Sequence, residues 1–296
     1  MRIVVTGRGG QVVRALLEKG PATGHEIVAV GRPQLDLTDD ADTIARVLIE
    51  AAPDAIVSAA AYTAVDKAEE DRDRAFAINA RGAGYVANAA HRLNVPLIHL
   101  STDYVFDGLK PSPYVEDDPT GPTGVYGASK LAGEKAVLAV HDKAAILRTA
   151  WVYSPFGGNF VKTMLRLARD RDEVSVVADQ RGNPTSAFDI ADAVLGVVAA
   201  LGKSSSTKLP GIFHMTSRGD TSWAGFAEAI FAASGALGGP VARVRWISTL
   251  DYPTKAKRPA NSRLDSSKLF ETYGLRLPEW QDPLDRIVSR LVYAQV

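Results

Sequence analysis

The chain begins Met1-Arg2-Ile3-Val4-Val5-Thr6-Gly7-Arg8-Gly9-Gly10-Gln11-Val12-Val13, an apolar run that leads into a glycine-rich turn. Residues 3–6 predict a short buried strand, and Gly7 and Gly10 take the first two positions of a Gly-x-x-Gly-x-x-Gly loop. Such a loop brings the backbone close to a pyrophosphate at the positive end of the following helix. The turn by itself fits a plain tight turn equally well, so its position directly after the first strand is what favours a dinucleotide site.

Outward from this stretch, short apolar runs alternate with longer segments that have helical spacing. We expect strands at residues 3–6, 26–31, 55–60, 97–101 and 145–148, and helices at 41–52, 75–93 and 129–140. This alternation is typical of repeated strand-helix-strand units. The predicted fold class is therefore α/β, with a doubly wound parallel Rossmann-type sheet.

The regularity fades after Trp151, where Pro and Gly cluster. We expect residues 1–150 to form the dinucleotide-binding Rossmann domain and residues 151–296 to form mainly a smaller, substrate-binding lobe. A helix at about residues 186–201 can belong to either lobe. The low-complexity segment 203–208 is expected to be an exposed loop.

Composition excludes several function classes. Lys plus Arg number 34 and Asp plus Glu number 34, so the balanced charge disfavours nucleic acid as a partner. With no cysteine, the chain has no disulfide, thiolate metal site or cysteine nucleophile. No leader-like or membrane-spanning apolar run is apparent, so we expect a cytoplasmic protein without a membrane partner. A homodimer is possible.

Two features complicate the cofactor site. Val13 stands at the third glycine position, where its bulk is expected to displace the first helix slightly. Gly31-Arg32 replaces the acidic residue that usually holds an NAD ribose, and Arg8 lies in the loop itself. Both arginines can pair with a 2′-phosphate, which favours NADPH with NADH also possible, although solvated surface arginines are an equal alternative.

Further cofactor contacts are expected at the ends of the second and third strands. Asp36 and Leu37 are expected beside the adenine, with helix capping as the alternative for the polar residues Asp36 and Thr38. Small residues end the third strand, where a cofactor can pass close to the backbone. The full expected cofactor-binding set is Gly7, Gly10, Gln11, Val12, Arg32, Asp36, Leu37, Ala60, Ala61, Tyr62, Tyr126 and Lys130.

Tyr126 and Lys130 form a Tyr-x-x-x-Lys pair, and this spacing puts both side chains on one helix face. An ammonium group beside a phenol favours the phenolate, so we expect Lys130 to lower the pKa of Tyr126. Thr102 ends the fourth predicted strand, where catalytic groups of open α/β sheets gather. Its hydroxyl can hydrogen-bond a carbonyl that is becoming an alkoxide. Asn79 either braces this site or is a structural cap.

At these residues the chain resembles the extended short-chain dehydrogenases, and within them the reductases of 4-keto-6-deoxy nucleotide sugars. The resemblance spans nearly the whole chain, in seven ordered segments: residues 7–11, 59–69, 101–108, 126–134, 148–153, 179–185 and 258–264.

This resemblance implies hydride transfer from a nicotinamide cofactor to C4 of a deoxythymidine-diphosphate 4-keto-6-deoxy sugar. Tyr126 would protonate the carbonyl oxygen, Lys130 would hold the nicotinamide ribose, and Thr102 would polarise the carbonyl. It also places Thr102, Asp103, Trp151 and Arg258 at the substrate, and Arg263 is a further candidate for the diphosphate. For Trp151, core packing between the lobes is an equal alternative.

The resemblance leaves other functions open. Dehydratases and epimerases share the Tyr-Lys pair, but dehydratases typically carry an Asp-Glu pair after the threonine, and here Asp103 is followed by Tyr104. A non-catalytic regulatory subunit, like that of methionine adenosyltransferase, uses the same fold. Some relatives bind a divalent cation early in the first helix, where this chain reads Val12-Val13-Arg14-Ala15, so no metal is expected there. The five histidines show no close ligand spacing and are expected to be structural.

Overall fold

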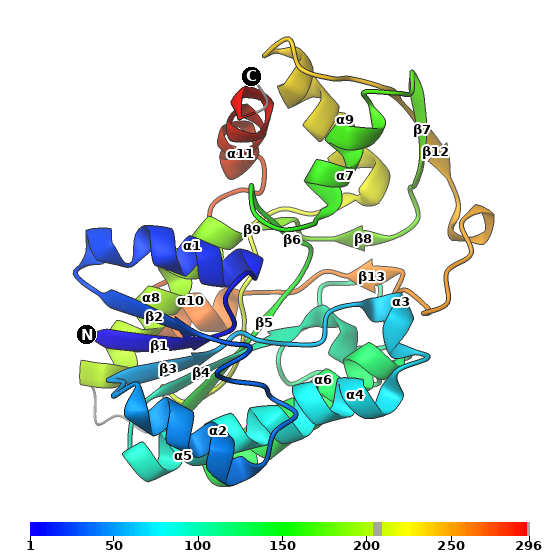
Figure 1. The fold of residues 1–296 in the computed structure, drawn as a ribbon. Helices are drawn as coiled ribbons and strands as arrows, with labels where there is room; N and C mark the ends of the chain where they lie inside the picture. The colour runs from blue at the N-terminus through cyan, green and yellow to red at the C-terminus, as the bar shows by residue number, and fades with distance from the viewer. Residues whose placement is uncertain (204–208, 295–296) are drawn as a thin grey trace.

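A six-stranded parallel sheet forms the centre of the larger lobe in this computed structural model, which describes residues 1–203 and 209–294 (Figure 1). The strand order is β10-β5-β4-β3-β1-β2. These strands are β1 (Arg2–Thr6), β2 (Glu26–Val30), β3 (Ala55–Ser58), β4 (Leu97–Thr102), β5 (Ala144–Thr149) and β10 (Gly211–His214). The predicted fold class and the five predicted strands are confirmed, with ends that shift by one or two residues.

The order in which the chain adds strands to the sheet reverses at β1. In register, Val5 of β1 pairs with Ala29 of β2 on one side and with Val57 of β3 on the other. The chain therefore crosses over β1 between β2 and β3, and a crevice opens at the carboxyl ends of β1 and β3. In open α/β sheets this switch point is where ligands bind.

Helices cover both faces of the sheet, and each face has its own apolar core. On one face α1 (Gln11–Lys19), α8 (Ala187–Lys203) and α10 (Ser267–Tyr273) pack against Ile3 and Val5. On the other face α2 (Ala41–Glu50), α5 (Ala83–Leu93) and α6 (Val125–Val140) pack against Val4 and Ile56. Successive strand residues point to opposite faces, so a buried strand needs apolar residues throughout, and these strands have them.

The predicted helix at 75–93 is a composite. It comprises the end of α4 (Arg72–Phe76), a π-helical turn η2 (Ala77–Gly82) and α5, and the short helix α3 (Val65–Ala68) precedes it. The π-helical turn contains the buried side chain of Asn79. Single π-helical turns of this kind are often found at functional sites.

The smaller lobe is a helical layer against a two-stranded sheet (Figure 1, upper part). It contains α7 (Phe160–Leu167), α9 (Trp223–Gly235) and α11 (Asp282–Tyr293), with β7 (Glu173–Val177) parallel to β12 (Arg243–Ile247). Short strands lie between the lobes: β6 (Val152–Tyr153) with β9 (Thr185–Ser186), and β8 (Arg181–Gly182) between β11 (Thr221–Ser222) and β13 (Asn261–Ser262). Short 3₁₀ turns cover Pro21–Thr23, Asp103–Val105 and Thr249–Asp251.

Three segments from the second half of the chain lie with the first lobe. The helix expected at about residues 186–201 is α8, and it packs on the sheet; β10 extends the sheet beside β5, and α10 covers the same face as α8. The last two segments were not anticipated. Residues 204–208 of the low-complexity segment lie outside the described residues. No helix among residues 1–203 and 209–294 combines the length and apolar character that crossing a membrane requires.

Candidate active site

The glycine loop leaves the first turn of α1 open. Gly7 has φ +101°, a conformation that residues with a side chain rarely adopt, and it turns the chain out of β1. Gly10 caps α1 with an extended backbone, and no side chain occupies the free N–H groups of the first turn. These groups and the helix dipole provide the anion site that a pyrophosphate needs.

Thr6 joins the two strands on either side of the crevice. Its buried hydroxyl accepts hydrogen bonds from the backbone N–H groups of Ala59 and Ala60, both at 3.0 Å. This contact fixes the small-residue segment after β3 against the end of β1. Sequence analysis missed Thr6, because a threonine at a strand end has no distinctive signal.

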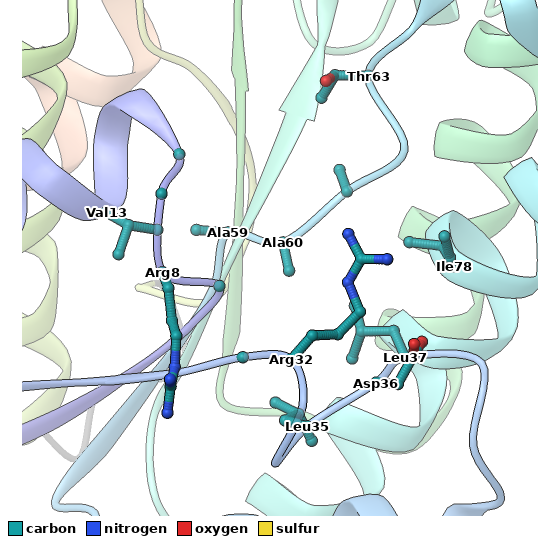
Figure 2. A pocket seen from close by; sticks show the side chains of 15 residues that line it. Arg8, Val13, Arg32, Leu35, Asp36, Leu37, Ala59, Ala60, Thr63 and Ile78 are labelled. Atoms are coloured by element: carbon teal, nitrogen blue, oxygen red, sulfur yellow. The ribbon is translucent and has the colours of Figure 1, made fainter. Parts of the chain in front are cut away.

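A cavity of about 390 Å³ opens at this point (Figure 2). Of the expected cofactor residues, Gly7, Gly10, Arg32, Asp36, Leu37, Ala60 and Ala61 line it; Arg8, Gly9, Val13, Gly31, Leu35, Ala59, Thr63 and Ile78 line it as well. The cavity therefore runs from the glycine loop past the end of β2 to the segment after β3, as an extended dinucleotide requires.

Two exposed arginines flank the cavity. The Arg32 side chain extends across it between Ala60 and Ile78, whereas the Arg8 side chain points away from the Arg32 guanidinium, toward the bottom of the view (Figure 2). Arg8 donates a hydrogen bond to the Gln34 side chain. Among the described residues, neither guanidinium group is paired with a carboxylate within 4.0 Å, so both are available to an anionic ligand.

Asp36 makes a local turn with Thr38, which differs from the helix capping that sequence analysis kept as its alternative. Its Oδ1 accepts hydrogen bonds from the Thr38 backbone at 3.0 Å and from the Thr38 hydroxyl at 2.8 Å. The backbone hydrogen bond from Thr38 is the main reason that the pKa of Asp36 is lowered, and nearby Arg32 adds to this effect. The N-cap of α2 is Asp40, so neither Asp36 nor Thr38 caps that helix.

Five expected cofactor residues do not line the cavity: Tyr126 and Lys130, which are described below, and Gln11, Val12 and Tyr62. The Gln11 side chain donates to Val152 O at 3.2 Å and accepts from Ser154 at 2.7 Å, so it ties α1 to the second lobe. Val12 packs on the apolar core, and the Tyr62 hydroxyl donates to Asp71 at 3.2 Å. The roles of these five residues at the cofactor stay predictions.

Thr102 and Tyr126 come together at the carboxyl edge of the sheet. Gly124 caps α6, and the Glu69 carboxylate accepts a hydrogen bond from Val125 N at 2.8 Å. Tyr126 therefore lies in the first helical turn, and the helix begins earlier than the predicted start at residue 129. Tyr126 and Thr102 share a hydrogen bond that lowers the pKa of the phenol. Burial outweighs it and, with Asp103, raises the pKa of Tyr126 to about 12.

Lys130 lies on the same helix face but binds elsewhere. Its Nζ donates to Leu100 O at 2.6 Å and lies 3.4 Å from His99 Nε2. The expectation that Lys130 lowers the pKa of Tyr126 is therefore wrong for this structure. The ammonium group is committed to β4, and burial lowers the pKa of Lys130 itself to about 8. Tyr126 is consequently a protonated phenol at neutral pH.

Buried polar groups that sequence analysis missed hold α6 against the sheet. Arg148 on β5 makes a bidentate ion pair with Glu134 on α6, at 2.9 and 2.7 Å, and both side chains are 2% exposed. Ser101 donates to the same carboxylate at 2.5 Å. His99, below Lys130, contacts Ser58 Oγ at 3.1 Å. These contacts fix the height at which Tyr126 and Lys130 stand above the sheet.

Asn79 braces α6, the helix that carries Tyr126 and Lys130. Its side chain accepts from Tyr62 N at 2.8 Å, donates to Tyr62 O at 3.1 Å and donates to Ser129 on α6 at 2.9 Å. It therefore connects the segment after β3 with the helix that carries Tyr126. Of the two alternatives for Asn79, this geometry favours the bracing role.

Asp103 is buried directly behind Thr102. Thr102 donates to Asp103 Oδ1 at 2.9 Å, while Oδ2 is buried without a hydrogen-bond partner. Burial raises the pKa of Asp103 to about 6, although hydrogen bonds from Ser262 and Thr102 oppose the shift. The unpartnered oxygen is a ready acceptor for a sugar hydroxyl.

Trp151 stands where the chain passes from β5 into the second lobe. It has φ +49°, unusual for a bulky residue, and its ring stacks on Trp223 at 3.5 Å between centroids. Gly182 gives it room, since a Cβ there would lie 2.4 Å from the indole. The Trp151 ring is half-buried, so it can pack between the lobes and also contact a substrate.

A second cavity, of about 800 Å³, lies in the smaller lobe, and Arg258 lines it together with Trp223, Gln180 and Tyr252. The Arg258 Nη2 atom lies 3.2 Å from Asp66 on α3, while its Nε is buried without a partner. Arg258 also acts electrostatically on Tyr104, whose ring contacts that of Tyr126 edge-on at 5.5 Å. Arg258 therefore links this cavity electrostatically to the Tyr104–Tyr126 ring pair.

Arg263 is already engaged. Its Nε donates to Asn261 Oδ1 at 2.8 Å, and its Nη2 donates to the backbone carbonyl of Pro111. These bonds hold two loops together and favour a structural role over contact with a diphosphate.

Comparison with known proteins gives one family and close relatives over the full chain. The family model described as the RmlD substrate binding domain matches residues 1–293. A dTDP-4-dehydrorhamnose reductase of Sinorhizobium fredii is 52% identical over 292 residues, which cover 99% of this chain and 98% of that protein.

Two solved structures are also similar. A dTDP-4-dehydrorhamnose reductase of Clostridium acetobutylicum has a TM-score of 0.91 and 37% identity, with full coverage of both chains. Another, from Bacillus anthracis in complex with NADP, has a TM-score of 0.90 and 37% identity, and covers 98% of this chain and 99% of that one.

Proposed function

We propose a function from this premise: the chain belongs to the family described as the RmlD substrate binding domain, which matches residues 1–293. The protein is an NADPH-dependent reductase of the C4 keto group of dTDP-4-dehydro-β-L-rhamnose, and its product is dTDP-L-rhamnose. The full-length likeness to reductases of this name, at up to 52% identity, carries the proposal. A protonated Tyr126 beside Thr102, on the same carboxyl edge of the sheet as the dinucleotide cavity, is the matching chemistry in this chain.

The cavity residues fit NADPH. The uncapped first turn of α1 would hold the pyrophosphate, and Arg32, with Arg8 beside it, would hold the 2′-phosphate. Lys130 would hold the nicotinamide ribose, for which its ammonium group has to turn from Leu100 O. NADPH supplies the hydride when it is bound. We expect NADH to be accepted no better than NADPH.

The chain's own residues supply the proton and the polarisation. Tyr126 would donate its phenolic proton to the C4 oxygen as that atom gains negative charge. Thr102 would donate a hydrogen bond to the same atom, for which its hydroxyl has to turn from Asp103 Oδ1. A phenol with a pKa of about 12 is almost fully protonated at neutral pH, so the acid is present in the form that reduction requires. Reprotonation from solvent then completes the cycle.

The second cavity fits the nucleotide part of the substrate. Arg258 would pair with the diphosphate, and Trp151 and Asp103 would contact the sugar between this cavity and Tyr126. Dehydration is disfavoured because Tyr104 stands where dehydratases typically have the Glu of an Asp-Glu pair. Water elimination would then lack its usual second acidic group.

The test is to incubate the purified protein with NADPH and the keto sugar, to follow the absorbance of the reduced nicotinamide ring, and to identify the product by NMR. We expect stoichiometric NADPH oxidation and a product with the L-rhamno configuration at C4. A product with the opposite C4 configuration would make the protein a different 4-ketoreductase. No oxidation, with NADPH still bound, would favour the binding-subunit alternative.

Two further expectations follow from this function. We propose the cytoplasm as its compartment, because the reaction consumes reduced nicotinamide cofactor. The homodimer stays a prediction that light scattering of the purified protein will test.

A further inference from the structure

Two of the five histidines meet at the edge of the sheet opposite the cofactor. His91 lies in the last turn of α5, and His141 is the residue that ends α6. Asp142 follows it in the link to β5. One ring nitrogen of each histidine and one carboxylate oxygen of Asp142 lie within 4.8 Å of one another, the sole such group of three among the residues that the structure describes. Their distance in sequence hid this group from sequence analysis.

His141 has a buried lone pair without a partner. The residue is 2% exposed, and its Nε2 lies 2.8 Å from the backbone carbonyl of Val95. A carbonyl oxygen only accepts, so Nε2 carries the ring proton and Nδ1 carries a lone pair. Nδ1 is buried and has no hydrogen-bond partner. Buried polar atoms are nearly always satisfied, so an unpartnered one calls for a ligand or another explanation.

This arrangement is the one that metal-ligating histidines adopt. Such a histidine donates its other N–H to a backbone carbonyl or a carboxylate, which fixes the tautomer and the direction of the ring. Val95 provides that carbonyl for His141. The rings of His91 and His141 meet edge-on, with centroids 5.9 Å apart. His141 is thus oriented before any ion binds.

The other two side chains are free to close on an ion. His91 and Asp142 are both exposed, so their side chains can turn without disturbing the core. A tetrahedral ion with bonds of about 2.0–2.1 Å holds its ligands about 3.3 Å apart. Closing the present separations requires movements of an ångström or so, which side-chain rotation at two exposed residues supplies.

We propose that His91, His141 and Asp142 form a binding site for a divalent transition-metal ion of the zinc type. Two imidazoles and one carboxylate suit Zn²⁺, Co²⁺ or Ni²⁺, whereas Mg²⁺ and Ca²⁺ prefer oxygen ligands. Water fills the fourth position. This site is new with respect to the proposed reaction, and it departs from our expectation that the histidines are structural.

The bound ion would fasten the ends of α5 and α6 together. An ion that binds the folded chain alone raises its stability in proportion to the logarithm of ion concentration over the dissociation constant. Tyr126 stands at the other end of α6, roughly 22 Å away at about 1.5 Å per residue. The ion is therefore expected to change stability and to leave turnover unchanged.

The experiment uses untagged full-length protein that has been dialysed against a chelator. Zn²⁺ is titrated by calorimetry, and Co²⁺ is followed by its visible absorption, which reports the coordination geometry. We expect one ion per chain in the micromolar range or tighter, a four-coordinate Co²⁺ spectrum and a higher melting temperature with Zn²⁺.

Variants decide where the ion binds. His91→Ala and Asp142→Asn change exposed residues, so both should fold, and each should weaken binding by at least about tenfold. His25→Ala is the matched control, since no comparable ligand group surrounds His25 in the described part of the chain, and it should bind as the wild type does. Absence of saturable binding, or unchanged binding in His91→Ala, would overturn the proposal.

Discussion

Tyr126 combines burial with a hydrogen bond to Thr102, and this combination suits an acid better than a base. Because burial and Asp103 raise the pKa of the phenol to about 12, the proton leaves only when a stronger base, such as a developing alkoxide, forms beside it. Lys130 is engaged at Leu100 O, so the usual argument from the Tyr-x-x-x-Lys spacing does not apply until that ammonium group turns.

Replacing Tyr126 with Phe keeps the ring and removes the proton. We expect turnover to fall by roughly two to four orders of magnitude, the usual contribution of a positioned general acid, with NADPH affinity and melting temperature nearly unchanged. Single-turnover kinetics measure the chemical step directly. Tyr85→Phe, on α5 in the first lobe, is the control and should retain wild-type turnover. A wild-type rate in Tyr126→Phe would mean that another group is the acid.

Asp103 should make stability depend on pH. Well below pH 3.8 its carboxyl is protonated in the folded and unfolded chains alike and adds nothing. As the pH rises from the ordinary pKa of 3.8 to the folded value of about 6, the folded chain holds the proton longer, so stability falls as pH rises. The full loss above pH 6 is about 3 kcal/mol.

The measurement is urea unfolding of wild type and Asp103→Asn at pH 4.5 and 7.5. The variant should gain stability relative to wild type as the pH rises. Asp107→Asn is the control: a hydrogen bond from Tyr114 lowers the pKa of Asp107, so this carboxyl is ionised in both states at these pH values, and the difference from wild type should stay nearly constant. If the difference in the free energy of unfolding between wild type and Asp103→Asn is the same at both pH values, Asp103 has the same pKa in the folded and the unfolded chain.

Arg32 is the residue through which we expect the chain to favour NADPH. A hydrogen bond to a charged group contributes about 1.5–3 kcal/mol, so Arg32→Ala should weaken NADPH binding by roughly 10- to 100-fold and leave NADH binding nearly unchanged. Dissociation constants for both cofactors test this. Arg46→Ala, on the exposed side of α2, is the matched control. If Arg32→Ala weakens the binding of NADPH and NADH equally, Arg32 does not recognise the 2′-phosphate.

At the scale of elements, the local sequence pattern was enough to predict the strands of the central sheet that precede residue 150. Buried parallel strands are short and apolar throughout, so β1 to β5 were predicted within one or two residues. β10 and α10 were missed, because Gly211–His214 is brief and pairs with β5 from more than sixty residues away. For the same reason Glu134, Arg148 and Thr6 were missed: their roles depend on which strand ends meet, and sequence spacing does not show this.

Val13 tests how the first helix meets the sheet. It is 2% exposed, packs in the core with Ile3 and Val5, and also lines the cofactor cavity. Val13→Gly should lose about 1 kcal/mol from glycine in a helix and about 1.5–3 kcal/mol from lost apolar burial. If the valine holds the helix away from the pyrophosphate, NADPH should bind more tightly to the variant.

Val13→Ala separates these two effects, because alanine removes the methyl groups but retains helix propensity. Its stability should lie between those of wild type and Val13→Gly in urea unfolding. Dissociation constants for NADPH that stay equal across the three proteins by calorimetry would show that Val13 affects packing alone.

At the scale of the whole molecule, the two lobes meet over the catalytic edge of the sheet. The Asp66 carboxylate on α3 accepts a hydrogen bond from Ala256 N at 3.1 Å and pairs with Arg258, and Lys255 pairs with Glu70. These contacts place a loop of the smaller lobe over the first. We therefore propose two tasks for Arg258: it joins the lobes, and its unpartnered Nε binds the substrate.

Changing Arg258 and Asp66 separately distinguishes these tasks. Arg258→Ala removes both, so the KM for the nucleotide sugar should rise by roughly tenfold or more, as expected for a lost charge-assisted hydrogen bond, while NADPH affinity stays the same. Asp66→Asn weakens the contact between the lobes but keeps the guanidinium group, so its effect on KM should be much smaller. Arg263→Ala is the control for charge, because that arginine is bound to Asn261 and Pro111, and it should alter stability more than KM. If Asp66→Asn raises KM as much as Arg258→Ala does, the arginine acts by holding the lobes together, and the diphosphate must be bound by another group lining the second cavity.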